Sequence, residues 1–272
     1  TIARGEERNK PVSRIVDEIN SLYEQGINEV VLTGVHIGGY GGDNNPGLSG
    51  LIKSILAETT IPRLRLGSLE PWDIQEDFFE LFSNSRFMPH LHLPLQSGCD
   101  AVLRRMARRC LTSEYNALLR TLRACVEVFN VSTDIIVGFP GESEDEWQQS
   151  LAFIEKCGFS HVHIFPYSAR HGTRAAMLPG QVESSVKKQR TRQLSSLVSR
   201  IRSELMTGFN GHAFPVLFEN HTNNSADGKL EYLGYTPNYL KVKIISDREF
   251  SLSNQIHPVK MTGYDEESQL MR

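Results

Sequence analysis

Long hydrophobic runs and an excess of charge of one sign are both missing from this sequence. No stretch approaches the ~20 consecutive apolar residues that a membrane-spanning helix needs, so we expect no membrane association. Lys+Arg number 29 and Asp+Glu 32, which leaves a formal net charge of -3. With 39% hydrophobic and 22% charged residues in 272, the composition excludes collagen-like, disordered and membrane classes and allows one large domain with a smaller one.

Cysteine is scarce, and the four cysteines, at 99, 110, 125 and 157, form no C-x-x-C or tighter pair. A zinc or iron–sulfur site needs ligands grouped locally, and a disulfide framework is typical of short secreted chains. We therefore expect reduced, mostly buried thiols in a cytoplasmic protein. An initiator Met and a signal peptide are missing too, because the chain opens T-I-A-R-G, so we expect a fragment of a longer protein.

The first two thirds of the chain alternate between strand-like and helix-like segments. Short apolar runs predict strands at 29–33, 64–68, 90–95, 132–137 and 161–165. Helical spacing predicts helices at 12–25, 48–58, 75–83, 113–129 and 183–207, and an S-x-x-E capping box at Ser143 and Glu146 begins another. This alternation predicts an α/β fold with a parallel sheet or barrel, here a (β/α)6 barrel missing its first strand.

After Gly211 the pattern changes to short alternating strands split by Asn, Gly and Asp turns. Strands are predicted at 214–219, 231–235, 239–245 and 256–261. About 60 residues of short strands are typical of a small antiparallel β-barrel. We therefore divide the chain into domains 1–210 and 211–272.

Five predicted strands of the first domain end in Gly, Pro or small polar residues, at 33–36, 68–71, 95–98, 134–142 and 165–173. Functional residues of parallel α/β folds lie at the carboxyl ends of strands. Five such ends in register predict a cavity lined with polar groups. The residues alone favour a small-molecule enzyme with ligand groups at Ser68, Glu70, Gln96 and Asp134.

Other readings of the motifs are weaker. The Gly-rich loop 38–42 is neither a Walker loop nor G-x-G-x-x-G, and a Ser-His-Asp triad lacks a nucleophile elbow. Five histidines invite the hypothesis of a catalytic metal site, but hydrogen-bonded core histidines are the favoured interpretation. The histidines in question are His36, His90, His92, His161 and His163.

Two basic groups are candidates for RNA contact. Arg104, Arg105, Arg108 and Arg109 place like charges at i,i+4, which weakens a helix unless an anion compensates. Solvated arginines with acidic neighbours are the alternative. Tyr239, Lys241 and Lys243 are predicted on one strand face, a pattern that suits nucleic-acid contact. However, residues 211–272 carry six Lys+Arg against eight Asp+Glu, so a solvated β face is the alternative there.

Several strings together resemble one family, the radical S-adenosylmethionine (radical SAM) methylthiotransferases. The strings are H-L-P-L-Q-S-G-C-D-A-V-L-R-R-M, T-D-I-I-V-G-F-P-G-E and F-P-Y-S-A-R-H-G-T. The start, T-I-A-R-G followed by P-V-S-R, looks like the segment just after the family's C-x-x-x-C-x-x-C motif. The string G-Y-T-P-N-Y resembles the TRAM RNA-binding module. T-G-V-H-I-G-G-Y-G looks most like the branch that modifies threonylcarbamoyladenosine beside the tRNA anticodon. Sister branches act on isopentenyladenosine or on a ribosomal protein.

The resemblance implies an activity, cofactors and partners. It implies a cytoplasmic tRNA methylthiotransferase that uses S-adenosyl-L-methionine, two 4Fe-4S clusters, tRNA and an electron donor. Matched position by position, the cofactor-binding residues would lie at the five strand ends. They are Thr33 and Gly34; Ser68 and Glu70; Gln96; Asp134, Ile136 and Gly138; and Phe165 and Tyr167.

The sequence departs from the family in one respect, because the three cluster cysteines and the domain before them are missing from it. We therefore expect this chain to be inactive on its own. A non-catalytic RNA-binding protein derived from the family is the competing hypothesis.

Overall fold

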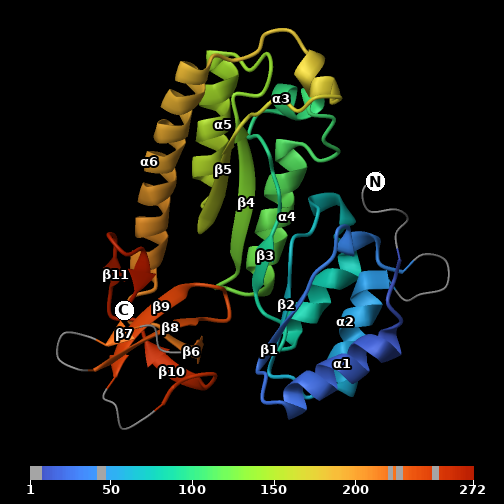
Figure 1. The fold of residues 1–272 in the computed structure, drawn as a ribbon, viewed down its shortest axis with the longest axis vertical. Helices are drawn as coiled ribbons and strands as arrows, with labels where there is room; N and C mark the ends of the chain where they lie inside the picture. Colours follow the sequence, from blue (N-terminus) through green and yellow to red (C-terminus); the bar gives the residue numbers. More distant parts are fainter. Residues whose placement is uncertain (1–7, 42–46, 220–222, 225–228, 247–250) are drawn as a thin grey trace.

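Parallel strands with helices between them form most of the structure. The computed structural model describes residues 8–41, 47–219, 223–224, 229–246 and 251–272. Within these ranges five parallel strands follow one another in chain order (Figure 1): β1 (Glu29–Leu32), β2 (Arg63–Leu66), β3 (His90–His92), β4 (Asn130–Val137) and β5 (His161–Pro166). β1 pairs with β2, and β3 to β5 form a second ladder. Isolated bridges Leu64–Phe87 and Ser68–His92 join the two ladders. The predicted α/β class is confirmed.

The two faces of these strands have different surroundings. One face enters the main hydrophobic core through buried residues such as Leu64, Leu91, Ile135 and Val162. Because side chains alternate along a strand, the neighbouring residues point the other way. We call this second face the open face, and it carries Val31, His92, Asp134 and His163, whereas its amino-end part, including Arg65, is buried.

The helices lie close to where helical spacing predicts them. Their bounds are α1 (Val12–Glu24), α2 (Gly47–Glu58), α3 (Asp100–Arg105), α4 (Thr112–Cys125), α5 (Glu144–Cys157) and α6 (Ser184–Gly208). The predicted capping box begins α5, since Ser143 Oγ accepts from Glu146 N at 3.2 Å and Glu146 Oε2 accepts from Ser143 N at 2.9 Å. The helix expected at 75–83 is instead a 3₁₀ helix, Glu76–Ser83. Its three-residue winding keeps Phe78 and Leu81 both on the buried side.

The C-terminal part folds into a separate sheet. Its strands are β6 (Ala213–Phe218), β7 (Asn223–Asn224), β8 (Leu230–Tyr235), β9 (Lys241–Ser246), β10 (Ile256–Lys260), β11 (Tyr264–Asp265) and β12 (Leu270–Met271). The order is β10-β6-β8-β9-β12-β11, with β7 on β8. The expectation of a purely antiparallel arrangement is wrong, because β12 runs parallel to β9 through the pair Met271–Val242. Both side chains are fully buried, and their packing holds the last short strand in that direction.

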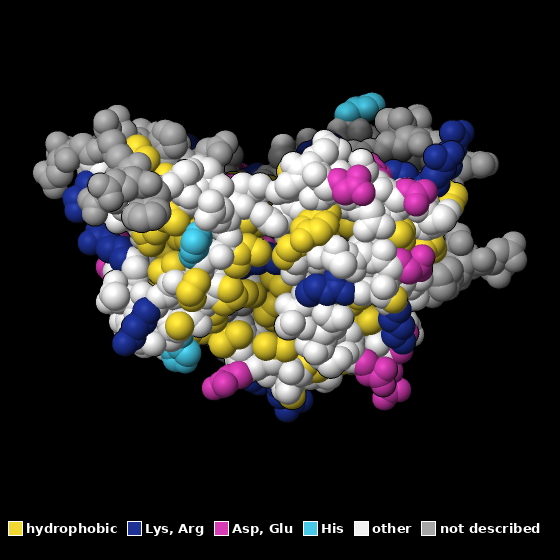
Figure 2. Space-filling model, turned by 90° about the horizontal axis from the view of Figure 1, so that it is seen from below, with side chains coloured by type: hydrophobic (Ala, Val, Ile, Leu, Met, Phe, Trp, Pro, Cys, Tyr) yellow, Lys and Arg dark blue, Asp and Glu magenta, His cyan; other side chains and the backbone are white. Residues whose placement is uncertain are grey.

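A second hydrophobic core lies under this sheet and is connected to the first by α6. Phe214, Val216 and Tyr232 are buried in it, together with Met206 near the end of α6. Leu194, earlier on α6, belongs to the main core. From below, hydrophobic side chains gather in a hollow between two lobes (Figure 2). In the described part of the chain, no helix has the length and apolar character needed to cross a membrane.

Candidate functional site

The carboxyl ends of the strands bring several of the predicted cofactor-binding residues into neighbouring positions. Gln96 bridges to β4, donating its N–H to Asp134 O at 2.8 Å and accepting from Ile136 N at 2.9 Å. Ile136 and Phe165 are register partners on β4 and β5. Phe165 is 51% exposed, although it is a large apolar residue. Polar and apolar groups thus face solvent along one edge of the sheet.

The first two strand ends continue this edge. Ser68 is exposed and bridges to His92, while Thr33 and Gly34 are exposed after β1. A Cβ on Gly67 would lie 3.2 Å from Thr33 Oγ1, which puts the ends of β1 and β2 side by side. Thr33 and Gly34 also line a cavity of about 580 Å³ between β1 and α1.

Gln96 has an unusual backbone. Its φ of 72° lies in the left-handed region, which non-glycine residues rarely occupy. Two backbone hydrogen bonds to β4 hold it there. Strain of this kind persists only where the surrounding structure enforces it, and it concentrates at functional sites. The backbone therefore marks Gln96 as a functional candidate, independently of its sequence motif.

The last two strand ends contain a tightly packed corner. Gly138 has φ 73°, and a Cβ there would lie 2.4 Å from Lys187 Cγ, so only glycine fits. Its N–H donates to Glu142 Oε2 at 2.9 Å, and burial raises the pKa of that carboxyl. Lys187 Nζ donates to Tyr167 O at 3.0 Å. The Tyr167 hydroxyl is buried and has no hydrogen-bond partner among the described residues. An unused donor of this kind at the strand ends fits a site for a polar organic cofactor.

Glu70 and Arg108, which the sequence assigned to different roles, bind each other. The two form an ion pair with Arg108 Nη2 2.6 Å from Glu70 Oε2. Arg108 also donates to Pro94 O at 2.8 Å and lies over Trp72 at 4.5 Å. Glu70 is therefore partly neutralised, and Arg108 is committed to the strand-end loops.

The remaining arginines of the basic group are not equivalent. Arg105 makes a two-bond ion pair with Glu146, at 2.9 and 2.6 Å, which raises the pKa of the arginine through the hydrogen bonds. Arg104 and Arg109 are exposed, and among the described residues neither has an ion pair. The alternative of acidic neighbours holds for Arg105 and Arg108, which leaves Arg104 and Arg109 open to an anionic partner.

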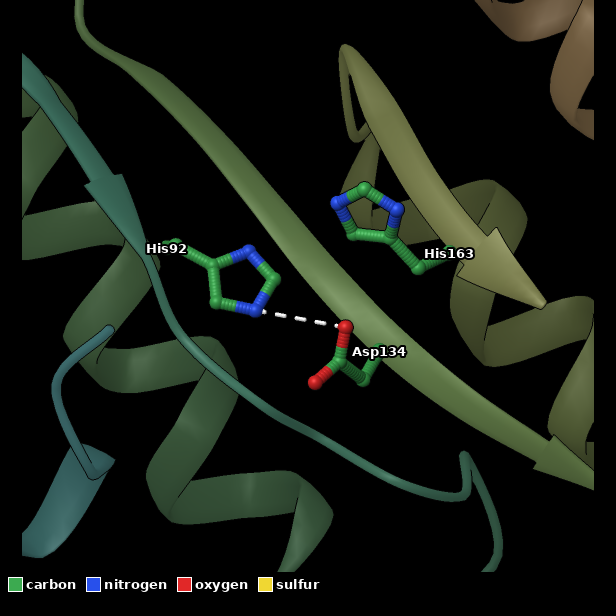
Figure 3. A group of neighbouring side chains, drawn as sticks. All are labelled: His92, Asp134 and His163. Carbon is green, nitrogen blue, oxygen red and sulfur yellow. Dashed lines mark ion pairs between the residues drawn. The ribbon is translucent and has the colours of Figure 1, made fainter. Parts of the chain in front are cut away.

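Three side chains on the open face converge, and sequence reasoning, which considered His92 and His163 as metal ligands, missed their grouping with Asp134 (Figure 3). One ligand-type atom each from His92, Asp134 and His163 lies within 4.8 Å of the others. His92 Nε2 lies 3.3 Å from Asp134 Oδ1. The available signal was strand register, because β3, β4 and β5 are neighbours and Asp134 pairs with His163.

Of the other histidines, His90 agrees with the expectation of a hydrogen-bonded core residue, whereas His161 is exposed. His90 is 4% exposed, and its Nε2 lies 3.1 Å from Ser132 Oγ. Burial and the nearby Arg65 charge hold the pKa of His90 well below its usual value. At His161, partial desolvation and the neighbouring His163 lower the pKa to about 4.

The amino ends of the strands are covered by a turn of the C-terminal sheet, residues 235–239. Arg63 Nη1 donates to Tyr235 O at 2.9 Å, and Arg65 Nη1 donates to Pro237 O at 3.1 Å. Asn130 Nδ2 donates to Asn238 O at 2.8 Å. These contacts tie the two parts of the chain together.

The prediction that Tyr239, Lys241 and Lys243 share one strand face is wrong for Tyr239. β9 begins at Lys241, and Tyr239 lies in the preceding turn with φ 65°. There its ring packs 4.6 Å from the Arg65 guanidinium and 4.7 Å from the ring of His90. Lys243 pairs with Glu231 at 2.9 Å, whereas Lys241 lies 5.8 Å from the Tyr235 ring.

The cysteines do not provide an iron–sulfur site. Cys99 and Cys157 are buried as expected, whereas Cys110 is half-buried and Cys125 exposed. Burial raises the pKa of Cys110 to about 11 and that of Cys157 to about 12, which disfavours the thiolate that metals require. In the described ranges, no group of three potential ligands contains a cysteine. The donor set therefore does not fit a 4Fe-4S cluster.

Comparison with known proteins gives consistent results. The model of the radical SAM superfamily matches residues 1–154. The threonylcarbamoyladenosine tRNA methylthiotransferase MtaB of Thermotoga maritima is 35% identical over 268 residues, which cover 98% of this chain and 60% of that protein. MtaB of Bacillus subtilis is 33% identical, over 88% of this chain and 54% of that protein.

Two further similarities complete the comparison. The tRNA-2-methylthio-N(6)-dimethylallyladenosine synthase of Magnetococcus marinus is 36% identical, over 84% of this chain and 53% of that protein. The coproporphyrinogen III oxidase of Escherichia coli, a radical SAM enzyme, matches the fold with a TM-score of 0.51 at 12% identity, over 83% of this chain and 60% of that one. The chain spans between 53% and 60% of the length of these curated relatives.

Proposed function

Because the chain belongs to the radical SAM superfamily and, within it, to the methylthiotransferases, we propose that the whole protein methylthiolates tRNA. The target is the threonylcarbamoyladenosine beside the anticodon. The observation that carries the proposal is the 35% identity with the Thermotoga maritima enzyme over 98% of this chain. The second candidate substrate is the dimethylallyl-modified adenosine, which the 36% identity with the Magnetococcus marinus enzyme favours.

The strand ends are the proposed site for S-adenosylmethionine. When bound, this cofactor would supply the radical that activates the adenine carbon. Thr33 and Gly34 would contact its amino group, and Ser68 and Glu70 would lie near its ribose and carboxylate. Gln96 would face the cavity. Asp134, Ile136 and Gly138 would lie beside ribose and adenine, with Phe165 and Tyr167 at the last strand end. The exposed Phe165 ring and the unpartnered Tyr167 hydroxyl support this placement.

The clusters are a separate matter, because the cysteines of this chain do not fit them. The two 4Fe-4S clusters of the whole protein, and the electron donor that reduces them, would need ligands from outside these 272 residues. The chain on its own is therefore expected to bind substrate or cofactor without turnover.

The C-terminal domain, residues 211–272, is the proposed TRAM-like RNA-binding unit, and domain 1–210 is the proposed partial barrel. Lys241 is the better candidate for phosphate contact, since Lys243 already pairs with Glu231. Arg104 and Arg109 are exposed on the first domain. A tRNA substrate supports a cytoplasmic location.

Mass spectrometry of tRNA nucleosides from a strain lacking the gene tests the proposal. We expect loss of the methylthio form of threonylcarbamoyladenosine and its return with the intact gene. Loss of the methylthio form of the dimethylallyl nucleoside instead would support the second candidate. An unchanged nucleoside profile would favour the non-catalytic RNA-binding protein.

The RNA contact has its own test, the salt dependence of tRNA affinity. Lys241→Gln should weaken binding and reduce the slope of log affinity against log salt by roughly one phosphate contact. Lys243→Gln, the matched control, should change the slope less. Equal slopes in both variants and the unchanged chain would move the contact to Arg104 and Arg109.

A further inference from the structure

We propose that His92, Asp134 and His163 form a binding site for a divalent transition-metal ion of the zinc class on the open face. The three side chains come from the neighbouring strands β3, β4 and β5 (Figure 3). They offer two imidazole nitrogens and one carboxylate oxygen, a donor set that suits zinc, iron, cobalt or nickel. This site is separate from the iron–sulfur chemistry of the proposed function, since it contains no sulfur ligand.

The spacing of the donor atoms matches coordination. With metal–ligand bonds of about 2.0–2.1 Å, two ligands of a tetrahedral ion lie about 3.3 Å apart. His92 Nε2 and Asp134 Oδ1 are separated by 3.3 Å. The third ligand atom, on His163, is within 4.8 Å of both. His163 is exposed, so its ring can turn toward the other two without disturbing the core.

The surroundings of His92 are compatible with a ligand role. Its Nδ1 lies 3.0 Å from Ser132 Oγ, which in turn lies 3.1 Å from Nε2 of His90. When Ser132 donates its proton to His90, its oxygen accepts the Nδ1–H of His92. The Nε2 lone pair of His92 then points toward Asp134. Metal-binding histidines are commonly oriented in this way through their second nitrogen.

The opposite proton arrangement gives a different result. If His90 donates to Ser132 and Ser132 donates to His92 Nδ1, then Nε2–H of His92 donates to Asp134. That network is an ordinary hydrogen bond between histidine and aspartate and needs no ion. Metal binding measured directly separates the two arrangements.

The proposal gives Asp134 a role different from contact with the cofactor ribose. His163 is outside the predicted set of cofactor residues, so a change at His163 removes a metal ligand without altering that set. Three protein ligands also leave open coordination positions on the exposed side, where a water molecule or an oxygen ligand can bind.

Cobalt(II) titration of the 272-residue chain, stripped with a chelator, tests the proposal, with zinc equilibrium dialysis as the second measurement. We expect one equivalent to bind, with visible d–d bands and no thiolate charge-transfer band. His163→Ala and Asp134→Asn should each abolish stoichiometric binding. Ser132→Ala should weaken it by about 10–100-fold, the cost typical of losing an outer hydrogen-bond partner.

His161→Ala and His171→Ala are the matched controls, and both should bind cobalt(II) as the unchanged chain does. Circular dichroism checks that each variant folds, and the exposed His163 makes its variant decisive if Asp134→Asn unfolds. The proposal is overturned by the absence of stoichiometric binding or by equal binding in His163→Ala. A thiolate band, which would assign the ion to a cysteine, also overturns it.

Discussion

At the amino ends of the parallel strands, Arg63 and Arg65 lie buried under backbone carbonyls of the turn 235–239. At the carboxyl ends of the same strands, Ser68 and Phe165 stay exposed and Gln96 is held in a strained conformation. At the amino end, the donors of Arg63 and Arg65 have fixed partners inside the chain, although the buried Nδ1 of His90 has no hydrogen-bond partner among the described residues. The carboxyl end keeps polar groups without such partners, including the Tyr167 hydroxyl.

The difference shows how one set of strands divides stability and binding between its two ends. Fixed ion pairs and carbonyl contacts stabilise the junction with the small sheet. A buried hydroxyl without a partner and a strained backbone are costly for the folded chain, and such features concentrate at functional sites. The His92–Asp134–His163 group lies between the two ends.

The largest expected effect comes from neutralising the amino end. Glu29 accepts two hydrogen bonds from Arg65, at 3.1 and 3.0 Å, and lies 3.6 Å from Arg63. Glu29→Gln leaves two guanidinium groups, each with a side chain 3% exposed, without their counter-charge. Breaking a buried pair costs about 3–5 kcal/mol, and we expect a loss of that size in urea unfolding.

Glu231→Gln is the matched control for this prediction. Glu231 pairs with Lys243 at 2.9 Å, with both side chains partly exposed. Such pairs contribute about 0–1 kcal/mol. Similar losses in both variants would show that burial at the amino end has no special role.

The second prediction concerns the strained carboxyl end. Gln96→Gly should raise the free energy of unfolding by about 1 kcal/mol, because glycine adopts φ 72° without strain. The same change should weaken binding of S-adenosylmethionine by the whole protein. Ala107→Gly is the control, since Ala107 is exposed with φ 56° and lies outside the strand ends. If both variants bind the cofactor equally well, the strain at Gln96 has no binding role.

Much of the fold could be predicted because its signals are local. Helical spacing gave α1, and Ser143 with Glu146 gave the start of α5. The final hairpin was missed because β11 and β12 have two residues each, too few for an alternating pattern. The parallel pairing of Met271 with Val242 depends on a buried contact between distant segments, which no local pattern encodes.

The candidate site was predictable only where the rule that functional residues lie at the carboxyl ends of parallel strands applies. Gln96 and Asp134 could be placed by that rule, and they lie side by side. The pairing of Glu70 with Arg108 could not be predicted, because the two are on different loops. Tyr239 was misassigned because its ring packs on Arg65, in the other part of the chain. Contacts between segments far apart in sequence account for these failures.

At neutral pH the smallest expected effect is that of His161, at the amino end of β5, because its contribution to stability changes only as the pH falls. The pKa of His161 in the folded chain is about 4, lowered first by burial and then by His163, against an ordinary value near 6.5 in the unfolded chain. Between these values the unfolded chain binds more protons, so stability should fall as pH drops from about 6.5 to about 4. Carboxylates such as Glu146 with lowered pKa act in the same direction at lower pH.

The measurement that isolates His161 is therefore a comparison between His161→Gln and the unchanged chain, in which the slope of unfolding free energy against pH is determined for each. We expect the variant to have the flatter slope and His171→Gln to match the unchanged chain. A slope unaffected by His161→Gln would mean that His161 has the same pKa in the folded and unfolded chain.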